Sequence, residues 1–411
     1  MARITILGAG SAGTMLANRL VKSKYNKEME ITVIDCDNRH YYQPGFLFIP
    51  FGMYTEKQIV KPRDKFLPSG VNYILEKVSA IEPEKNTIVF KNGDKHEYDF
   101  LVIATGARIV PDEIEGLADD GWRKDIFDFY TPDGAIALGQ YLENWQGGKM
   151  VLSITEMPIK CPVAPLEFLF LADWWFTKKG MRDKVDITLA TPLDGAFTKQ
   201  TCNIYLSKMI KEKNIEIVPH YSIGEVDNEN KVISSYDGKE IEYDLLVSVP
   251  TNMGAEVIED SGFGDELSFV PTEKHTLQSK VKDNIFVVGD ATDLPSSKAG
   301  SVAHFQVEIL TENLINRIHD KELVPGYDGH TNCFIESGYG KGILIDFNYE
   351  IEPLPGHFPI PKIGPFGLLK ETHINHWGKL AFRWIYWHML LRGRDIPFVK
   401  PEMSKSGKVF N

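Results

Sequence analysis

The chain has 411 residues, of which 43% are hydrophobic, and a formal net charge of -12. This length suffices for two or three domains, each with a core of its own. The acidic balance excludes a general affinity for nucleic acid, because binding to phosphates needs clustered Lys and Arg. The four cysteines are too scattered for a secreted disulfide framework, and no secretory signal opens the sequence, so we expect a cytoplasmic protein.

The first element is predicted to be a strand, RITILG, followed by an apolar pattern of helical spacing. Gly8, Gly10 and Gly13 lie between them in the spacing Gly-x-Gly-x-x-Gly. In dinucleotide-binding folds these glycines permit the tight turn, the approach of a pyrophosphate, and close helix-to-strand packing, respectively. A second strand, EITVID, ends in Asp35, where a carboxylate would hold the ribose hydroxyls. The pattern predicts a dinucleotide site rather than a surface turn.

A later strand, FLVIATGA, ends at Thr105 and Gly106, and another, NIFVVGDAT, ends at Gly289 and Asp290. These segments resemble the paired signatures of flavoproteins with two dinucleotide-binding domains, in which the late aspartate bonds the ribityl chain of FAD. A small residue would let the cofactor lie against the strand end, and the carboxylate would accept its hydroxyl hydrogen bonds. The three motifs together predict FAD as the cofactor.

Between these two segments, a second unit of the same kind is predicted from residue 148 onward. GKMVLSI predicts its first strand, APLEFLFLADWWFTKKG its helix, and KVDITLATP its second strand. The connecting loop, TEMPIKCPVAP, contains no glycine, and Pro162 and Pro165 remove backbone donors. The second strand has no acidic residue at its tip. We therefore expect that NADH and NADPH do not bind here, and that another donor reduces the flavin.

The residue that this loop presents is Cys161. An unpaired cysteine is most often a small buried hydrophobe. A thiol just before a helix N-terminus has a lowered pKa, however, and Lys160 would act in the same direction, so we expect a reactive thiolate. Glu167 falls in the first turns of the helix, where it would either transfer protons or lie at the surface.

Lys298 and Gly300 open the next predicted helix, after the strand that ends at Asp290. The N-terminus of that helix and the lysine would stabilise negative charge on a reduced flavin. The alternative is a solvated surface lysine.

Residues 373–394, HINHWGKLAFRWIYWHMLLRGR, predict a helix with a wide apolar stripe that includes Trp377 and Trp384. A buried core helix is one interpretation. Aromatic residues interleaved with basic ones suit a helix in the bilayer interface better, and residues 370–411 hold eight Lys or Arg against three acidic residues. The apolar, Pro- and Gly-rich segment 356–369 would join it. We therefore expect a peripheral protein whose C-terminal end attaches to the bilayer surface, on the cytoplasmic side.

Over nearly its whole length the chain resembles the sulfide:quinone oxidoreductases. The segments that carry the resemblance are GAGSAG, HYYQPGFLFIPFG, YDFLVIATGA, KCPVAPLEF, NIFVVGDAT and NCFIESGYGKGILIDF. The resemblance implies that Cys161 and Cys333 form a redox-active pair. It also implies that Phe334 contacts the quinone and that Pro44 lies near the flavin ring. Hydrogen sulfide would attack a sulfur-bridged form of the pair, sulfur would leave as polysulfide, and electrons would pass through FAD to a membrane quinone.

Many members of that family have a third cysteine upstream of the first, whereas none lies between Cys36 and Cys161 here. The resemblance is therefore to the two-cysteine members. Cys36, next to the ribose aspartate, and Cys202, in a predicted amphipathic helix, are interpreted as bystanders.

Together these patterns predict an α/β fold with two Rossmann-like domains of the glutathione reductase type and a C-terminal membrane-associating helical region. The predicted boundaries are 1–112 for the first part of the FAD domain, 113–265 for the second Rossmann-like domain, 266–325 for the return segment, and 326–411 for the quinone and membrane region. No metal site is expected, and a homo-oligomer is left open.

Three other functions remain as alternatives. A type II NADH:quinone dehydrogenase shares the fold, FAD and quinone, but it would need a second glycine loop. A protein like flavocytochrome c sulfide dehydrogenase would need export and a haem partner. A redox sensor or scaffold that retains FAD would not depend on both cysteines.

Overall fold

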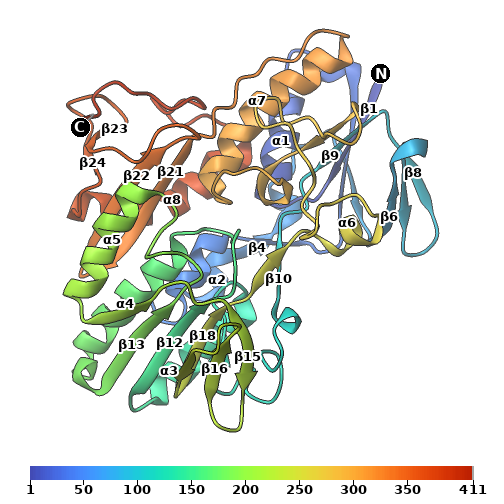
Figure 1. The fold of residues 1–411 in the computed structure, drawn as a ribbon. Helices are drawn as coiled ribbons and strands as arrows, with labels where there is room; N and C mark the ends of the chain where they lie inside the picture. The colour runs from blue at the N-terminus through green and yellow to red at the C-terminus, as the bar shows by residue number, and fades with distance from the viewer. Residues whose placement is uncertain (410–411) are drawn as a thin grey trace.

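The structure, a computed structural model, describes residues 1–409. Its helices and strands form three units, each built around a sheet, and Figure 1 shows them meeting near the middle of the molecule. The N-terminal unit is blue with a yellow to orange return segment, the second unit is teal to olive, and the C-terminal unit is orange to red. The predicted α/β fold is confirmed.

The N-terminal unit is a parallel sheet of five strands in the order β20-β9-β1-β2-β5. Its strands are β1 (Ala2–Leu7), β2 (Met29–Asp35), β5 (Asn72–Leu75), β9 (Phe100–Ile103) and β20 (Ile285–Val287). Helices α1 (Ser11–Lys22) and α7 (Gly300–Ile318) pack on each other beside it. The central strands consist largely of buried apolar residues, which is typical of parallel strands covered on both faces.

Smaller elements extend this unit. They are β3 (Arg39–Tyr41) paired with β4 (Val60–Pro62), the sheet of β6 (Val78–Glu82), β7 (Thr87–Phe90) and β8 (Lys95–Glu97), and helices α2 (Glu56–Ile59) and α6 (Glu256–Asp260). The antiparallel pair of β10 (Arg108–Val110) and β19 (Thr251–Met253) connects this unit with the second one.

The second unit repeats the arrangement with the strand order β11-β18-β12-β13-β14, again parallel. Its strands are β11 (Ile126–Phe127), β12 (Gly148–Ile154), β13 (Val185–Ala190), β14 (Ile215–Val218) and β18 (Leu245–Val249), and its helices are α3 (Pro132–Asn144), α4 (Ala164–Lys178) and α5 (Gln200–Glu212). A three-stranded sheet of β15 (Ile223–Asp227), β16 (Val232–Ser235) and β17 (Glu240–Glu242) lies at its edge. The predicted strand-loop-helix-strand order at residues 148–190 is confirmed.

The C-terminal unit brings distant parts of the chain together. Its strands β21 (Thr331–Gly338), β22 (Lys341–Phe347), β23 (Gly356–Phe358) and β24 (Phe366–Leu368) form one sheet, and helix α8 (His373–His388) packs on β21 and β22. Strand β21 also packs on α4, which is apolar almost all round and buried along most of its length. The predicted tail helix ends at His388, and a short 3₁₀ turn follows at Leu390–Arg392. Within residues 1–409, no helix combines the length and apolarity needed to cross a membrane.

Candidate active site

A cavity of about 600 Å³ lies where the three units meet. Fourteen of the fifteen residues predicted to hold the cofactor or the reacting groups line it: Gly8, Gly10, Asp35, Pro44, Thr105, Gly106, Cys161, Glu167, Gly289, Asp290, Lys298, Gly300, Cys333 and Phe334. The exception is Gly13, for which helix packing was the predicted role. The segments that line the cavity lie as far apart in the chain as Gly8 and Val399, so only the fold brings them together.

The glycines of the first loop differ in what surrounds them. A Cβ atom on Gly8, whose φ is +104°, would lie 2.4 Å from the carbonyl oxygen of Ala104, and a Cβ atom on Gly13 would lie 1.9 Å from the carbonyl oxygen of Gly8. Among the described residues, no neighbouring atom lies within 4 Å of such a Cβ on Gly10, and Gly10 lines the cavity. The first and third glycines therefore allow close packing, whereas the second leaves an open cradle at the N-terminus of α1 that suits a pyrophosphate.

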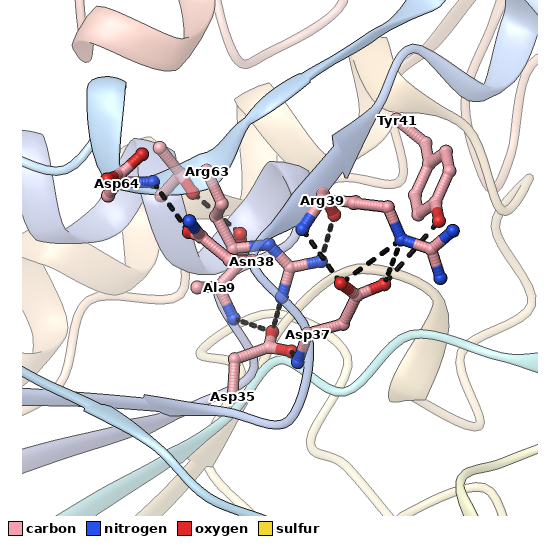
Figure 2. A network of polar contacts seen from close by, with 9 residues as sticks. Ala9, Asp35, Asp37, Asn38, Arg39, Tyr41, Arg63 and Asp64 are labelled. Carbon is pink, nitrogen blue, oxygen red and sulfur yellow. Dashed lines mark hydrogen bonds and ion pairs between the residues drawn. The ribbon is translucent and has the colours of Figure 1, made fainter. Parts of the chain in front are cut away.

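Asp35 is held by a polar network, which Figure 2 shows at the end of β2. Its Oδ2 accepts a hydrogen bond of 2.7 Å from the amide of Ala9 and pairs with the guanidinium of Arg63, while its Oδ1 accepts from the amide of Asp37 at 3.1 Å. Arg63 also donates to the carbonyl oxygen of Arg39 at 2.7 Å. The carboxylate is thus fixed beside the glycine loop, where it would hold a ribose.

The sequence interpretation missed Arg63. This residue is 7% exposed, lines the cavity, and its Nε has no hydrogen-bond partner within residues 1–409. No local pattern identifies it, because the short strand β4 that precedes it carries no glycine or acidic signature.

At the other end of the cofactor region, the Thr105 hydroxyl is buried without a hydrogen-bond partner in the described part of the chain, as expected of a group that bonds a ligand. Burial raises the pKa of Asp290. The Lys298 ammonium donates to the carbonyl oxygens of Asp290 at 2.9 Å and Thr292 at 2.6 Å, and burial lowers its pKa to about 8. Lys298 is therefore an anchored, buried cation rather than a solvated one, and these residues fit a dinucleotide cofactor.

Cys161 and Cys333 are free thiols that line the same cavity. Cys161 lies just before α4 with φ of +47°, and its amide donates to the carbonyl oxygen of Lys298 at 2.7 Å. Cys333 lies on β21, which packs against α4. The second unit and the C-terminal unit therefore each present one sulfur atom to the cofactor region.

The expectation of a thiolate at Cys161 is wrong for the free thiol. Burial, followed by the charge of Glu167, raises the pKa of Cys161 to about 12, and burial also raises the pKa of Cys333. Desolvation at the cavity wall thus outweighs the helix N-terminus in this shift. The cation that favours the Cys161 thiolate is Lys379 from α8, not the adjacent Lys160.

Glu167 is 1% exposed, so the surface alternative for this residue is excluded. Its Oε1 pairs with the ammonium of Lys379 at 2.7 Å and accepts from the amide of Glu336 at 2.7 Å. Lys379 also donates to the carbonyl oxygen of Phe334 at 3.0 Å. Burial raises the pKa of Glu167, and Lys379 opposes that shift. A carboxyl group and an ammonium with perturbed pKa values thus lie beside the two thiols, as proton-transfer chemistry requires.

The sequence interpretation also missed Lys379. Its place in an aromatic segment favoured a residue at the lipid surface, yet it is 8% exposed and lines the cavity. The signal that would identify it is its position on the face of α8 opposite to Trp377 and Trp384, which are 66% and 60% exposed.

The end of the cavity nearest α8 is apolar. Its lining there includes Phe334, Phe358, Pro359, Phe366, Phe382 and Ile385. Phe334 and Phe366 meet edge to face with ring centroids 5.2 Å apart. Such a chamber suits a flat, apolar molecule.

Comparisons with known proteins agree with this arrangement. Residues 2–136 match the family model described as pyridine nucleotide-disulphide oxidoreductase. The mitochondrial sulfide:quinone oxidoreductases of Dictyostelium discoideum and Mus musculus are 29% and 28% identical to this chain, and each alignment covers 95% of this chain and 86% of the relative. The X-ray structure of the sulfide:quinone oxidoreductase of Aquifex aeolicus matches with a TM-score of 0.79 at 20% identity, covering 96% of this chain and 92% of that chain.

The chain has the α/β fold of the pyridine nucleotide-disulphide oxidoreductases. Within this class, the chain resembles sulfide:quinone oxidoreductases over nearly its whole length, which confirms the resemblance that the motifs indicated.

Proposed function

We propose that the protein is an FAD-dependent enzyme that oxidises hydrogen sulfide to sulfane sulfur and transfers the electrons to a quinone. One observation carries the proposal: Cys161 and Cys333, from units far apart in the chain, line a single cavity together with the glycine loop. The relatives named for this activity support it, since they align with 95% of this chain. The relatives and the family match also imply a flavin, and we propose FAD because the first loop and Asp35 suit a dinucleotide.

The cofactor would be held by residues of the N-terminal unit. Gly8, Gly10 and Gly13 would accommodate the pyrophosphate, Asp35 the ribose, and Asp290 the ribityl hydroxyls. The remaining predicted contacts are Pro44, Thr105, Gly106, Gly289, Lys298 and Gly300. The flavin would supply two-electron redox chemistry, and the protein would position sulfur atoms and protons around it.

The thiols would accept the sulfur. Hydrogen sulfide would attack a disulfide between Cys161 and Cys333, so that the S–S bond breaks, a persulfide forms on one cysteine and a thiolate is left on the other. Because their pKa values are raised by burial, the free thiols need a proton acceptor, and Glu167 is the carboxylate beside them. Lys379 would stabilise the negative charge that develops there.

The second loop argues against a nicotinamide donor. The amide of Lys160 donates to Asn252 at 2.9 Å, and the amide of Cys161 donates to the carbonyl oxygen of Lys298 at 2.7 Å. These two amides are therefore not free to bind a pyrophosphate. Pro162 and Pro165 have no amide N–H to offer. A type II NADH dehydrogenase is accordingly not favoured.

The quinone would occupy the apolar end of the cavity and contact Phe334. Quinones with long apolar tails reside in the bilayer, so the outward face of α8 would lie on a lipid surface. The exposed Trp377, Trp384 and Ile374, together with Phe398 beyond the helix, support this attachment. The double variant Trp377→Gln with Trp384→Gln should bind liposomes of anionic lipid less well in a flotation assay and still reduce a short-chain, water-soluble quinone. Unchanged flotation would contradict the attachment.

An anaerobic titration tests the enzymatic proposal. Sulfide should bleach the flavin absorbance of the purified protein, a short-chain quinone should restore it, and NADH should leave it unchanged. Bleaching by NADH alone, or none by sulfide, would overturn the assignment.

A further inference from the structure

A second acid-base pair lies beside Glu167 and Lys379 in the interface of α8 and β21. The Nδ1 atom of His376 is 2.7 Å from Oε2 of Glu336, whose side chain is 1% exposed. His376 and Lys379 are three residues apart on α8, so both side chains lie on the same face of the helix. The amide of Glu336 donates to Glu167 at 2.7 Å. The two pairs are therefore neighbours: the backbone amide of Glu336 bonds Glu167, and the charges of Glu167 and Lys379 act on the pKa of the Glu336 carboxyl.

The outer end of this second pair reaches the surface. The His376 side chain is 13% exposed, and its Nε2 atom has no hydrogen-bond partner within residues 1–409. Its ring lies 5.7 Å from that of Trp377, which is 66% exposed. An imidazole with one nitrogen on a buried carboxylate and the other without a protein partner can pass a proton inward. In the proposed membrane-bound state, this part of α8 would lie at headgroup depth, where the membrane meets water.

The inner end reaches the cavity wall. Lys379, Glu167 and Phe334 all line the cavity, and Phe334 lies two residues before Glu336 on the same face of β21. Burial raises the pKa of Glu336, and His376 and Lys379 oppose that shift. The other titratable groups near the pair are Tyr54, Arg383, His373 and the ion pair of Lys341 with Glu371.

The proposed reaction requires a proton from outside. Written with the hydrosulfide anion, it is HS⁻ + quinone + H⁺ → S⁰ + quinol, in which sulfide loses two electrons, the quinone gains both, and S⁰ remains as sulfane sulfur on the cysteine pair. The quinol carries two new O–H bonds, and hydrosulfide supplies only one proton. One further proton per turnover must therefore reach the apolar end of the cavity from solvent.

We propose that His376 and Glu336 form a proton path from the outer face of α8 to the Glu167–Lys379 pair, and that this path supplies quinol formation. The inference rests on the proposed function, which it deepens by assigning the side from which the proton enters. His376 would take up a proton at Nε2 and release one from Nδ1 to Glu336, which would pass it to the inner pair. Neither residue touches the reacting atoms, so both act as proton-transfer and positioning residues.

Rapid mixing of the flavin-loaded protein tests the path. The flavin is reduced either with sulfide or with dithionite, and its reoxidation by a short-chain quinone is then followed. In His376→Ala and Glu336→Gln, reoxidation should slow by about 10²-fold, the lower range for a positioned proton-transfer group. Bleaching by sulfide should stay within about twofold of the wild-type rate, a difference below 0.5 kcal/mol.

Two further readouts separate a proton path from a merely structural role. Imidazole added to His376→Ala should restore reoxidation, and a carboxyl C=O band in the reduced-minus-oxidised infrared spectrum should be absent in Glu336→Gln. The matched control is His373→Asn. His373 lies one turn before His376 on α8, is exposed, and bonds the carbonyl oxygen of Gly340, so this variant should behave as wild type.

The two proposals can fail independently. If dithionite-reduced variants reoxidise at the wild-type rate, or if imidazole does not restore His376→Ala, the proton path is wrong. If sulfide fails to bleach the wild-type protein while quinone still reoxidises the dithionite-reduced flavin, the proposed function is wrong, and the path is judged from the dithionite experiment alone.

Discussion

The loops that join β1 to α1 and β12 to α4 occupy equivalent places in two similar units, yet they differ in what they leave open. The first has Gly10, with no atom within 4 Å of a Cβ position, at the start of an uncapped helix. The second has no glycine, and the amides of Lys160 and Cys161 bond to other parts of the chain. One loop offers free donors to an anion, and the other offers a sulfur atom.

This difference shows how a repeated scaffold can acquire a second chemistry. Parallel sheets direct the loops at their carboxyl ends toward a common crevice, so either loop can reach the same cofactor. In the proposed function the second loop holds a nucleophile instead of an anion, since its backbone donors are bonded internally and its helix carries Glu167. Both loops therefore line the same cavity, and a few residues in each loop determine which group it offers there.

The largest effect is expected from removing the sulfur atom of the second loop. Cys161→Ser should lower the rate of sulfide-dependent flavin bleaching by on the order of 10⁴-fold, as for loss of a covalent nucleophile. Cys333→Ser should have a similar effect, because one cysteine cannot both hold sulfur and relay electrons. Stopped-flow absorbance measures the rate, and flavin content should remain that of wild type.

Cys202→Ala is the control for these two variants, since Cys202 is buried in α5 and does not line the cavity. It should bleach at the wild-type rate. A Cys161→Ser protein that still bleaches rapidly would mean that the second loop has no chemical role.

The second effect concerns the first loop. Gly10→Ala should weaken FAD binding by about tenfold or more, at least 1.4 kcal/mol, because the added methyl group enters the space proposed for the pyrophosphate. The free energy of unfolding of the flavin-free protein should change by no more than about 1 kcal/mol, since the methyl group meets no atom of the described residues within 4 Å. Fluorescence titration and chemical denaturation measure the two quantities.

Gly13→Ala is the matched comparison, because its Cβ atom would lie 1.9 Å from the carbonyl oxygen of Gly8. This variant should lose stability even without flavin. If Gly10→Ala were equally unstable and bound FAD normally, the open cradle would not be the cofactor site.

The sequence predicted the two strand-loop-helix units, the candidate cofactor residues and both cysteines, because each lies in a local pattern of glycines, strand ends or loop residues. It did not predict Arg63, Lys379, Glu336 or His376. These residues act through contacts between distant segments, and the chain separation between Glu167 and Lys379 leaves no periodicity to detect. The raised pKa of Cys161 was not predicted either. The helix N-terminus is a local feature of the sequence, whereas desolvation of the thiol depends on segments that are distant in the chain.

A smaller effect tests the electrostatics of the second loop. Because the pKa of Cys161 is raised to about 12 from an ordinary value of 9.0, its alkylation by iodoacetamide should increase with pH well above 9 instead of levelling off. Glu167→Gln removes a charge that raises this pKa and should accelerate alkylation at pH 8, by about tenfold for each unit of pKa. Lys379→Met removes a charge that lowers it and should slow alkylation. Mass spectrometry of the Cys161 peptide gives the rates.

The same shift has a consequence for stability. A group whose pKa is higher in the folded protein contributes stability below its unfolded pKa and loses it as pH rises through the folded value. Wild type should therefore lose more stability than Cys161→Ser between pH 9 and pH 12. Equal losses would contradict the burial of this thiol.

The smallest effect is expected from restoring a glycine to the second loop. Pro162→Gly returns one backbone donor and should lower the free energy of unfolding by about 1 kcal/mol, through the greater freedom of the unfolded chain. NADH should still fail to bleach the flavin, because the amides of Lys160 and Cys161 remain bonded to Asn252 and Lys298. If NADH did reduce the flavin of this variant, Pro162 alone would exclude the nicotinamide in the wild-type protein. The internal hydrogen bonds of the second loop would then not be the reason why it fails to bind NADH.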